Sequence, residues 1–221
     1  MPQSKDCVNT QSYLGRNATP IPIFESVRRV LYSIELDPTS DHIINKDVGA
    51  DRIYTVVDDG YSKPWKCKTL FMNPPGETFI FGTREERIFW LNELEKPRKQ
   101  RTVRPHNMTT AYAADWFRKA HREYTQGNVK HAILLLYRSG SIGCLGPLLD
   151  YPICITSSDA ESPLINGSGR FAFETIEGDK RIAQTSNTQS SAFVLLTKSK
   201  PKYHLFKEEF KQYGHILEKV N

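Results

Sequence analysis

The segment 131–137, which reads HAILLLY, constrains the fold most, because its apolar residues do not alternate with polar ones. A strand of this kind is buried on both faces, as in the centre of a parallel sheet covered by helices. Upstream of it, apolar residues at helical spacing predict an amphipathic helix, which Gly127 ends in a left-handed conformation. The residues of that helical face are Ala113, Trp116, Phe117, Ala120 and Tyr124. A helix that leads into a buried strand favours an α/β fold.

Polar residues follow three earlier predicted strands at the points where those strands end. The strands are predicted at 32–36, 53–57 and 69–72, which are short and rich in β-prone residues. They lead into Asp37-Pro38-Thr39-Ser40, Asp58-Asp59-Gly60 and Asn73-Pro74-Pro75-Gly76, respectively. In open α/β sheets, ligands bind at the carboxyl ends of the strands. The pattern therefore predicts a binding site at which Asp37, Asp58 or Asp59, and Asn73 meet.

The rest of the chain supplies further strands and helices for the same sheet. Further strands are predicted at 152–156, 170–175 and 191–197. Helical spacing is seen for Ile23, Phe24, Val27, Val30 and Leu31, and again for Phe206, Phe210 and Tyr213 before Gly214. We expect a mixed, mostly parallel sheet with helices on both faces. Because 221 residues with 38% hydrophobic content suit one core, we divide the chain into a polar lead at 1–18 and one domain at 19–221.

Composition and spacing argue against a membrane segment, a metal site and disulfides. No apolar run approaches the roughly 18 to 20 residues that span a bilayer. The four cysteines (Cys7, Cys67, Cys144 and Cys154) lie far apart, and the six histidines are dispersed without metal-ligand spacing. We therefore expect reduced thiols, no bound metal and a cytoplasmic protein.

The turn Asn73-Pro74-Pro75 calls for a chemical explanation, because an ordinary turn rarely carries two prolines after asparagine. The exocyclic amine of adenine is a poor nucleophile, since its lone pair is shared with the ring. The Asn73 side-chain oxygen and the Pro74 carbonyl would accept its two N–H bonds, and Pro75 would stiffen that carbonyl. Polar groups held in this way stabilise charge that develops in a transition state. Positioning supplies much of the remaining rate, so no catalytic histidine is needed.

A basic segment follows this turn. Between Lys96 and Arg104 the chain carries five basic residues and no acidic one: Lys96, Arg98, Lys99, Arg101 and Arg104. Pro97 prevents a regular helix or central strand there, so we predict a loop insertion at about 84–108. Such a charge run is often only a solvated surface. Placed directly after the Asn-Pro-Pro strand, these side chains would instead meet the phosphates of a nucleic acid.

These motifs, taken in order, resemble those of the phage-type DNA N6-adenine methyltransferases, or phage Dam family. The resemblance covers most of the chain, and the ordered set is more specific than Asn-Pro-Pro alone. Its segments are Thr19-Pro20, Leu36-Asp37-Pro38-Thr39-Ser40, Tyr54-Thr55, Asp59-Gly60, Trp65, Phe71-Met72-Asn73-Pro74-Pro75, Trp116, 132–136, 151–155 and Arg170-Phe171-Ala172-Phe173.

The resemblance implies a Rossmann-like fold, S-adenosylmethionine as the methyl donor and double-stranded DNA as the partner. It implies a bacterial cytosolic location, or a host cytosolic one if a phage encodes the chain. Asn73, Pro74 and Pro75 then contact the target amine. Thr19, Pro20, Asp37, Pro38, Thr39 and Asp59 contact the donor, and Trp65 joins the five basic residues at the DNA. The role in restriction, phage protection or regulation stays open.

Two departures from the family pattern keep other functions open. Gly76 stands where many amino-methyltransferases carry an aromatic residue that stacks on the flipped base, so Trp65, Phe79 or Phe81 would have to supply the stacking. A glycine-rich loop (G-x-G-x-x-G) is also absent. One alternative is a DNA-binding protein of the same fold without catalysis. Another is an amino-methyltransferase that acts on cytosine N4 or on a protein glutamine.

Overall fold

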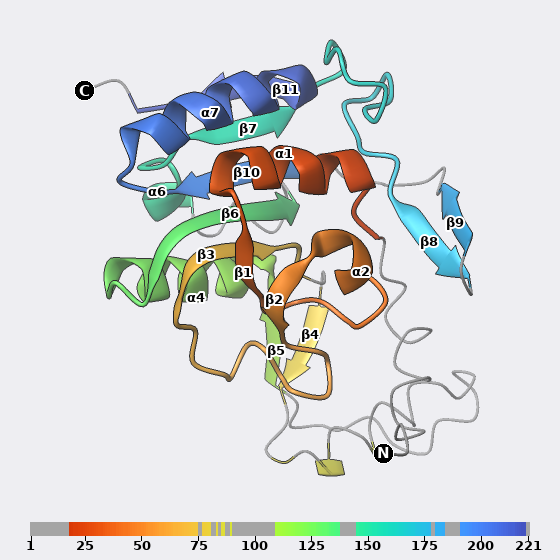
Figure 1. The fold of residues 1–221 in the computed structure, drawn as a ribbon, viewed down its shortest axis with the longest axis vertical. Coiled ribbons are helices and arrows are strands. Elements are labelled where there is room, and N and C mark those ends of the chain that lie inside the picture. Colours follow the sequence, from red (N-terminus) through yellow and green to blue (C-terminus); the bar gives the residue numbers. More distant parts are fainter. Residues whose placement is uncertain are drawn as a thin grey trace.

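A seven-stranded sheet forms the centre of the protein (Figure 1). The structure, a computed structural model, describes residues 18–74, 77–80, 83, 85, 86, 89, 109–137, 145–177, 180–183 and 191–219. The strand order is β11-β7-β10-β6-β3-β1-β2. The strands are β1 (Ile34–Asp37), β2 (Ala50–Ile53), β3 (Cys67–Met72), β6 (Val129–Tyr137), β7 (Ile153–Thr156), β10 (Ser191–Leu196) and β11 (Gly214–Leu217).

The pairing of the strands divides the sheet into two halves. Three parallel pairings join β2, β1, β3 and β6, and three antiparallel pairings join β6, β10, β7 and β11. The α/β class and the mixed sheet are confirmed. The expectation of a mostly parallel, Rossmann-like sheet is wrong, because β10 enters from the edge where β6 ends and so pairs with it antiparallel.

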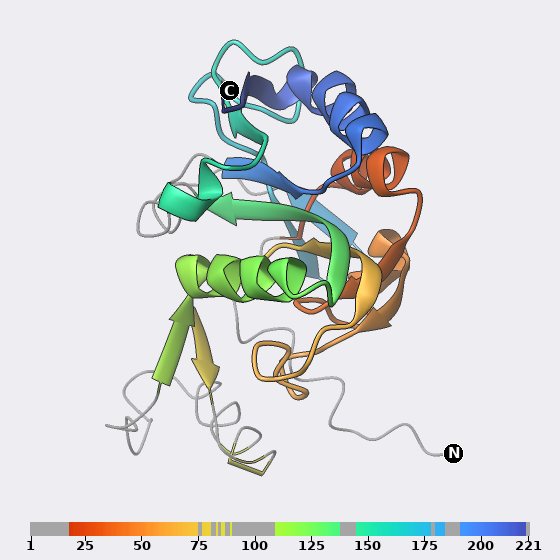
Figure 2. The same cartoon turned by 90° about the vertical axis from the view of Figure 1, so that its left-hand side faces the viewer.

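Helices cover both faces of the sheet, as expected. On one face α1 (Ile21–Leu31) packs against α7 (Lys200–Phe210), with the short α2 (Asn45–Val48) beside α1. On the other face lies α4 (Ala113–Thr125), as the side view shows (Figure 2). Two apolar clusters fill the two interfaces. The predicted face of α1 is buried almost completely, and burial of each such side chain contributes about 1.5–3 kcal/mol.

Two hairpins stand apart from the main sheet. One pairs β4 (Glu77–Ile80) with β5 (Thr109–Tyr112), and the other pairs β8 (Glu174–Glu177) with β9 (Lys180–Ala183). The predicted insertion at 84–108 falls between β4 and β5, whose ends pair at Ile80 and Thr109. Figure 2 shows this hairpin extending from the start of α4 away from the sheet. The remaining elements are α6 (Leu145–Leu148) and the 3-10 turn η4 (Lys211–Tyr213).

Element boundaries agree with the sequence pattern where periodicity is strong. Helices α1 and α4 and strands β3 and β6 occupy the predicted segments, and Gly127 follows α4 with a left-handed φ of 79°. Strand β2 ends at Ile53, where a strand was predicted to begin, because the chain turns there and the Tyr54 N–H donates to the Asp37 carbonyl. Strand β11 was not predicted.

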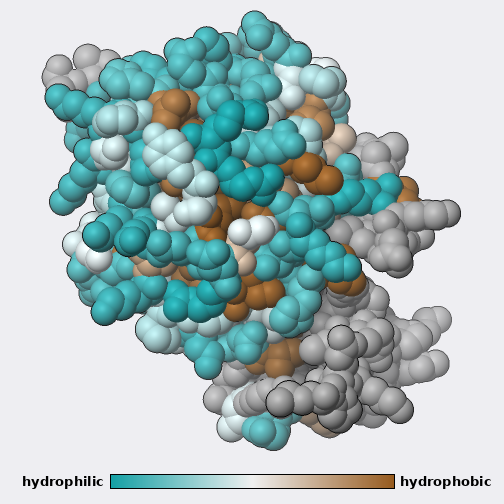
Figure 3. Space-filling model, viewed as in Figure 1, coloured by the Kyte–Doolittle hydropathy of each residue, from teal (hydrophilic) through white to brown (hydrophobic). Residues whose placement is uncertain are grey.

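The described surface is largely polar. Figure 3 shows a mainly hydrophilic face on which hydrophobic residues form small separate areas. Among the described residues, no helix has both the length and the apolar character needed to cross a bilayer.

Candidate active site

The order of the parallel strands reverses between β1 and β3, since β2 lies on one side of β1 and β3 on the other. Open α/β sheets bind ligands at such a reversal, beyond the carboxyl ends of the strands. We refer to the sheet edge where β1, β3 and β6 end as the switch edge. Asp37 ends β1 there, and Asn73 directly follows β3. The two strand ends named by the sequence therefore flank the reversal point.

Asn73 is held in place by two other segments of the chain. Its Nδ2 donates to Thr19 Oγ1 at 2.9 Å, and its backbone N–H donates to Thr39 Oγ1 at 3.2 Å. Its Oδ1 is buried and accepts no hydrogen bond from the described residues. The amide is therefore fixed in orientation while one strong acceptor is left unused.

A buried acceptor without a partner costs about 1–3 kcal/mol. Native proteins rarely keep such a group without a reason such as a ligand or a catalytic role. Here the fixed amide depends on Thr19, which is buried just before α1. The preceding residue, Ala18, exchanges two backbone hydrogen bonds with Glu174, of 2.6 and 3.1 Å. The position of Asn73 is thus determined by long-range contacts, which favours a specific task for its oxygen.

Asp37 and Thr39 form the turn beneath this amide. Asp37 Oδ1 accepts from the Thr39 N–H at 2.9 Å and from Thr39 Oγ1 at 2.8 Å. Both residues are buried, and the Thr39 hydroxyl also receives the Asn73 N–H. The predicted site residues Thr19, Asp37, Thr39 and Asn73 therefore belong to one hydrogen-bonded network. In this network Asp37 has a structural role in addition to the predicted donor contact.

The turn at Asp59 and Gly60 packs against the chain that follows β1. A Cβ atom on Gly60 would lie 2.0 Å from the carbonyl oxygen of Pro38, so only glycine fits. Asp59 is buried with a left-handed φ of 59°, and its carboxylate Oδ1 accepts from the Ser62 N–H at 3.3 Å. The structure thus brings the second acidic turn beside the first, as the sequence predicted.

Trp65 is not at the surface, and its predicted contact with DNA is wrong. Its side chain is 1% exposed, and Nε1 donates to the Gly60 carbonyl at 2.8 Å. The indole is stacked on Trp116, with the ring centroids 6.1 Å apart, and Lys119 Nζ lies 4.8 Å from its ring centroid. A ring enclosed in this way has no face for a base, so Trp65 instead supports the turn that carries Asp59.

Several predicted site residues lie outside the described part of the chain. These are Pro75, Gly76, Lys96, Arg98, Lys99, Arg101 and Arg104. Pro74 is described and buried, and Pro20 directly precedes α1. The hairpin of β4 and β5 begins four residues after Asn73, with Glu77 paired to Tyr112. The chain toward the basic segment therefore leaves from the switch edge.

Sequence reasoning missed Ser191, which lies at the switch edge on β10. Ser191 pairs with Tyr137 at the end of β6, and its Oγ is buried without a hydrogen-bond partner among the residues that the structure describes. Its backbone is satisfied by Thr156, whose Oγ1 accepts from the Ser191 N–H at 3.0 Å. No motif surrounds Ser191, so its state was visible only in three dimensions.

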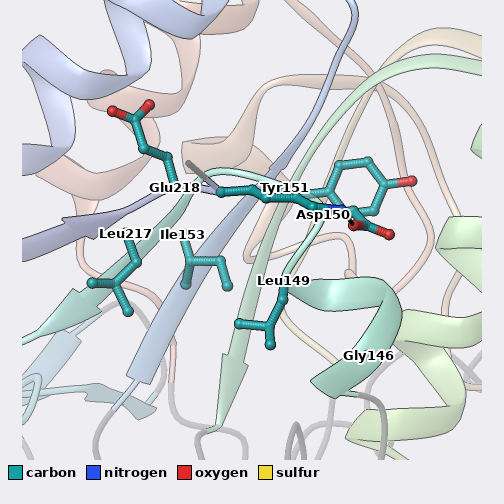
Figure 4. Close-up of a pocket in the computed structure, with 8 residues that line it drawn as sticks. Gly146, Leu149, Asp150, Tyr151, Ile153, Leu217 and Glu218 are labelled. Atoms are coloured by element: carbon teal, nitrogen blue, oxygen red, sulfur yellow. Dashed lines mark hydrogen bonds and ion pairs between the residues drawn. The ribbon is translucent and has the colours of Figure 1, made fainter. Parts of the chain in front are cut away.

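Other chemistries find little support among the described residues. No group of three or more His, Cys, Asp or Glu side chains there is arranged to hold a metal ion. Burial raises the pKa of the Cys67 and Cys154 thiols to about 12, so neither is a ready nucleophile. A pocket of about 440 Å³ lies between α6 and the end of β11 (Figure 4). It includes Ile153, where β7 begins, and is therefore at the edge of the sheet opposite Asn73.

Comparison of the chain with models of protein families, with curated proteins and with solved structures gives no match. A function must therefore be inferred from the network around Asn73 and from the charges near it.

Proposed function

We propose that this protein transfers a methyl group from S-adenosylmethionine to the exocyclic amine of adenine in DNA. The observation that carries the proposal is the buried, unpaired Oδ1 of Asn73 at the switch edge. An acceptor in this state suits a donor N–H that arrives with a ligand. The following Pro74 carbonyl is the second acceptor that the Asn-Pro-Pro motif offers.

The chain's own contribution is to orient the amine. With its Nδ2 engaged by Thr19, the Asn73 amide presents its oxygen without rotation. An acceptor fixed before the reaction stabilises positive charge on the amine as its lone pair is used, at no cost in reorganisation. Bound S-adenosylmethionine supplies an electrophilic methyl group, so the amine needs orientation more than it needs a strong base.

The acidic turns beside Asn73 fit the methyl donor in charge and position. Asp37 and Asp59 lie at neighbouring turns, and S-adenosylmethionine carries a positive sulfonium centre and an amino group. A carboxylate at a strand end also accepts hydrogen bonds from ribose hydroxyls in dinucleotide-binding folds. In this proposal Asp37 acts through its charge and by holding Thr39 in place.

The acceptor in the proposal is an adenine turned out of duplex DNA, which costs a few kcal/mol of unstacking. The basic segment at 96–104 is joined to the switch edge by the β4–β5 hairpin. Its lysines and arginines would contact phosphates near the target and supply a salt-dependent share of the affinity.

The decisive experiment compares Asn73→Ala with the parent protein in a methyl-transfer assay with labelled S-adenosylmethionine and unmethylated duplex DNA. Loss of one preorganised polar contact to a transition state typically costs about 100- to 1,000-fold in kcat, and we expect a loss of that size. Folding and donor binding should be nearly intact. Equal turnover in the two proteins would refute the role of Asn73.

Asn45→Ala is the matched control. The Asn45 side chain bonds both the N–H and the carbonyl of Ala50, at 2.9 and 3.0 Å, where β2 begins. Its removal should lower the unfolding temperature and leave turnover unchanged at temperatures where the variant is folded. Nucleoside mass spectrometry of the DNA product separates adenine N6 from cytosine N4. Donor binding without transfer to DNA would favour a protein amide as acceptor, and no donor binding would favour a DNA-binding protein without catalysis.

A further inference from the structure

Two buried side-chain polar atoms lack a hydrogen-bond partner in the described part of the chain: Asn73 Oδ1 and Ser191 Oγ. Ser191 is 0% exposed. The first atom is explained by the proposed function, whereas the second is not. The two are at the same edge of the sheet, since Ser191 pairs with Tyr137 at the end of β6 and Asn73 follows β3.

The two side chains are also on the same face of the sheet. Phe71 of β3 and Phe193 of β10 belong to the apolar cluster beneath α1 and α7. Side chains alternate between faces along a strand, so residues two positions away share a face. Asn73 and Ser191 stand two positions from Phe71 and Phe193, respectively. The hydrogen bond from Asn73 to Thr19, just before α1, agrees with this placement.

The separation of the two atoms follows from the register. Met72 pairs with Leu134 and Ser191 with Tyr137, so Asn73 is level with Leu135, two residues short of Ser191 along β6. Two strand spacings across the sheet and two residues along it give a separation of about 12 Å. This is comparable with the length of one nucleotide from its base amine to its backbone phosphate.

The order of the strands indicates which ligand reaches Ser191. Asp37 and Asp59, on the β1 and β2 side, lie to one side of Asn73, and Ser191 on β10 lies to the other. If the donor occupies the acidic side, the target nucleotide extends toward β6 and β10. We propose that Ser191 contacts the extruded nucleotide, its hydroxyl donating a hydrogen bond to a backbone phosphate oxygen. Serine hydroxyls are common donors to DNA phosphates. This inference rests on the proposed function.

The hydroxyl of Ser191 is not needed for the fold. Thr156 Oγ1 bonds the Ser191 N–H, donates to the Gly169 carbonyl at 2.7 Å and lies 3.0 Å from the Ser191 carbonyl. The strand is therefore satisfied through Thr156, and alanine at 191 would leave no described group unpaired. Ser26 offers a contrast on the same side of the sheet. It too is 0% exposed, but its Oγ lies 3.0 Å from the Tyr213 hydroxyl.

The test compares Ser191→Ala with the matched control Ser26→Ala. For each variant we would measure the unfolding midpoint, the KM for unmethylated duplex DNA, and the Kd for S-adenosylmethionine. We expect Ser191→Ala to raise the KM for DNA by about 10-fold or more, as when a hydrogen bond to a charged group is removed. Its unfolding midpoint should be equal to or above that of the parent, and the donor Kd should not change. Ser26→Ala should lower the midpoint and leave the KM unchanged.

A second measurement tests the phosphate. Once the methylated adenine has been mapped, a duplex with a methylphosphonate at a phosphate beside it should bind the parent more weakly. Ser191→Ala should bind the modified and unmodified duplexes equally at that position, because the variant has no hydroxyl to donate to the phosphate. A lower unfolding midpoint with unchanged KM would show that Ser191 is structural and overturn the inference, as would a change in donor Kd alone. If the parent protein itself transfers no methyl group to DNA, the proposed function fails, a result distinct from either.

Discussion

The two edges of the sheet treat buried polar groups differently. At the opposite edge, where β1, β3 and β6 begin, Lys202 Nζ donates to the carbonyls of Val30 and Leu31 at 2.9 and 3.1 Å. Nearby, Lys119 and Asn128 both donate to the Glu123 carboxylate, at 3.2 and 2.9 Å. At the switch edge, two buried atoms have no partner among the described residues. Polar groups at the opposite edge therefore serve stability, and in our proposal those at the switch edge are kept for a ligand.

The paired lysines show what stability alone requires. Burial lowers the pKa of both Lys119 and Lys202, because the charged form loses contact with water. Hydrogen bonds offset part of this cost, and aromatic rings add to them. Lys119 Nζ lies 4.8 Å from the centroid of Trp65, and Lys202 Nζ lies 4.0 Å from that of Tyr32. Within the described part of the chain, nothing comparable satisfies Asn73 Oδ1.

The largest effect on stability is expected at the opposite edge. Lys119→Met leaves the buried Glu123 carboxylate without its cation, which should lower the free energy of unfolding by about 3–5 kcal/mol. The double variant Lys119→Met/Glu123→Leu should recover most of that decrease, because it removes both charges. Chemical denaturation measures both values. Methyl transfer by the folded fraction should be unchanged, and its disappearance would mean that the two edges are not independent.

A smaller effect on stability is expected at Asp37. Asp37→Ala removes the acceptor for two groups of Thr39, which should cost about 1–3 kcal/mol and also weaken donor binding. Asp37→Asn keeps an acceptor oxygen and removes the charge, so it should be nearly as stable as the parent. Calorimetry with S-adenosylmethionine then isolates the charge. Unchanged donor affinity in a folded Asp37→Asn protein would leave Asp37 with its structural role alone.

The basic segment should affect stability least. Neutralising Lys96, Arg98, Lys99 and Arg101 together should weaken binding to all DNA sequences about equally. The slope of log affinity against log salt should become shallower by roughly 0.9 for each phosphate that the protein no longer neutralises. Donor affinity should not change. An unchanged salt slope would identify the segment as a solvated surface, and an altered base preference with the same slope would mean that it reads sequence.

The sequence allowed prediction of those elements whose pattern is local. The helical spacing in α1 and α4 and the unbroken apolar run in β6 reflect burial that each element carries by itself. The polar residues Asp37 and Asn73 were assigned to strand ends because turn-forming residues follow short apolar stretches. The structure places both at the switch edge.

What the sequence could not supply depends on contacts between distant segments. The antiparallel position of β10 is set by its neighbours β6 and β7, and no periodicity within β10 reports it. Trp65 was assigned to the DNA because the identity of an aromatic residue does not reveal its burial. Ser191 went unnoticed because the lack of a partner is a property of the space around a hydroxyl. The unused acceptor of Asn73 is hidden for the same reason.

The place of β10 also has a consequence for synthesis of the chain. It lies between β6 and β7 in the sheet, although it follows both along the sequence. Chains emerge from the ribosome N-terminus first, so β6 and β7 appear before the strand that joins them. Until then β7 lacks both of its neighbours in the seven-stranded sheet, since β11, its other partner, emerges later still. Open strand edges promote aggregation, so a transcript cut short before codon 191 would yield an adhesive fragment and not a smaller enzyme.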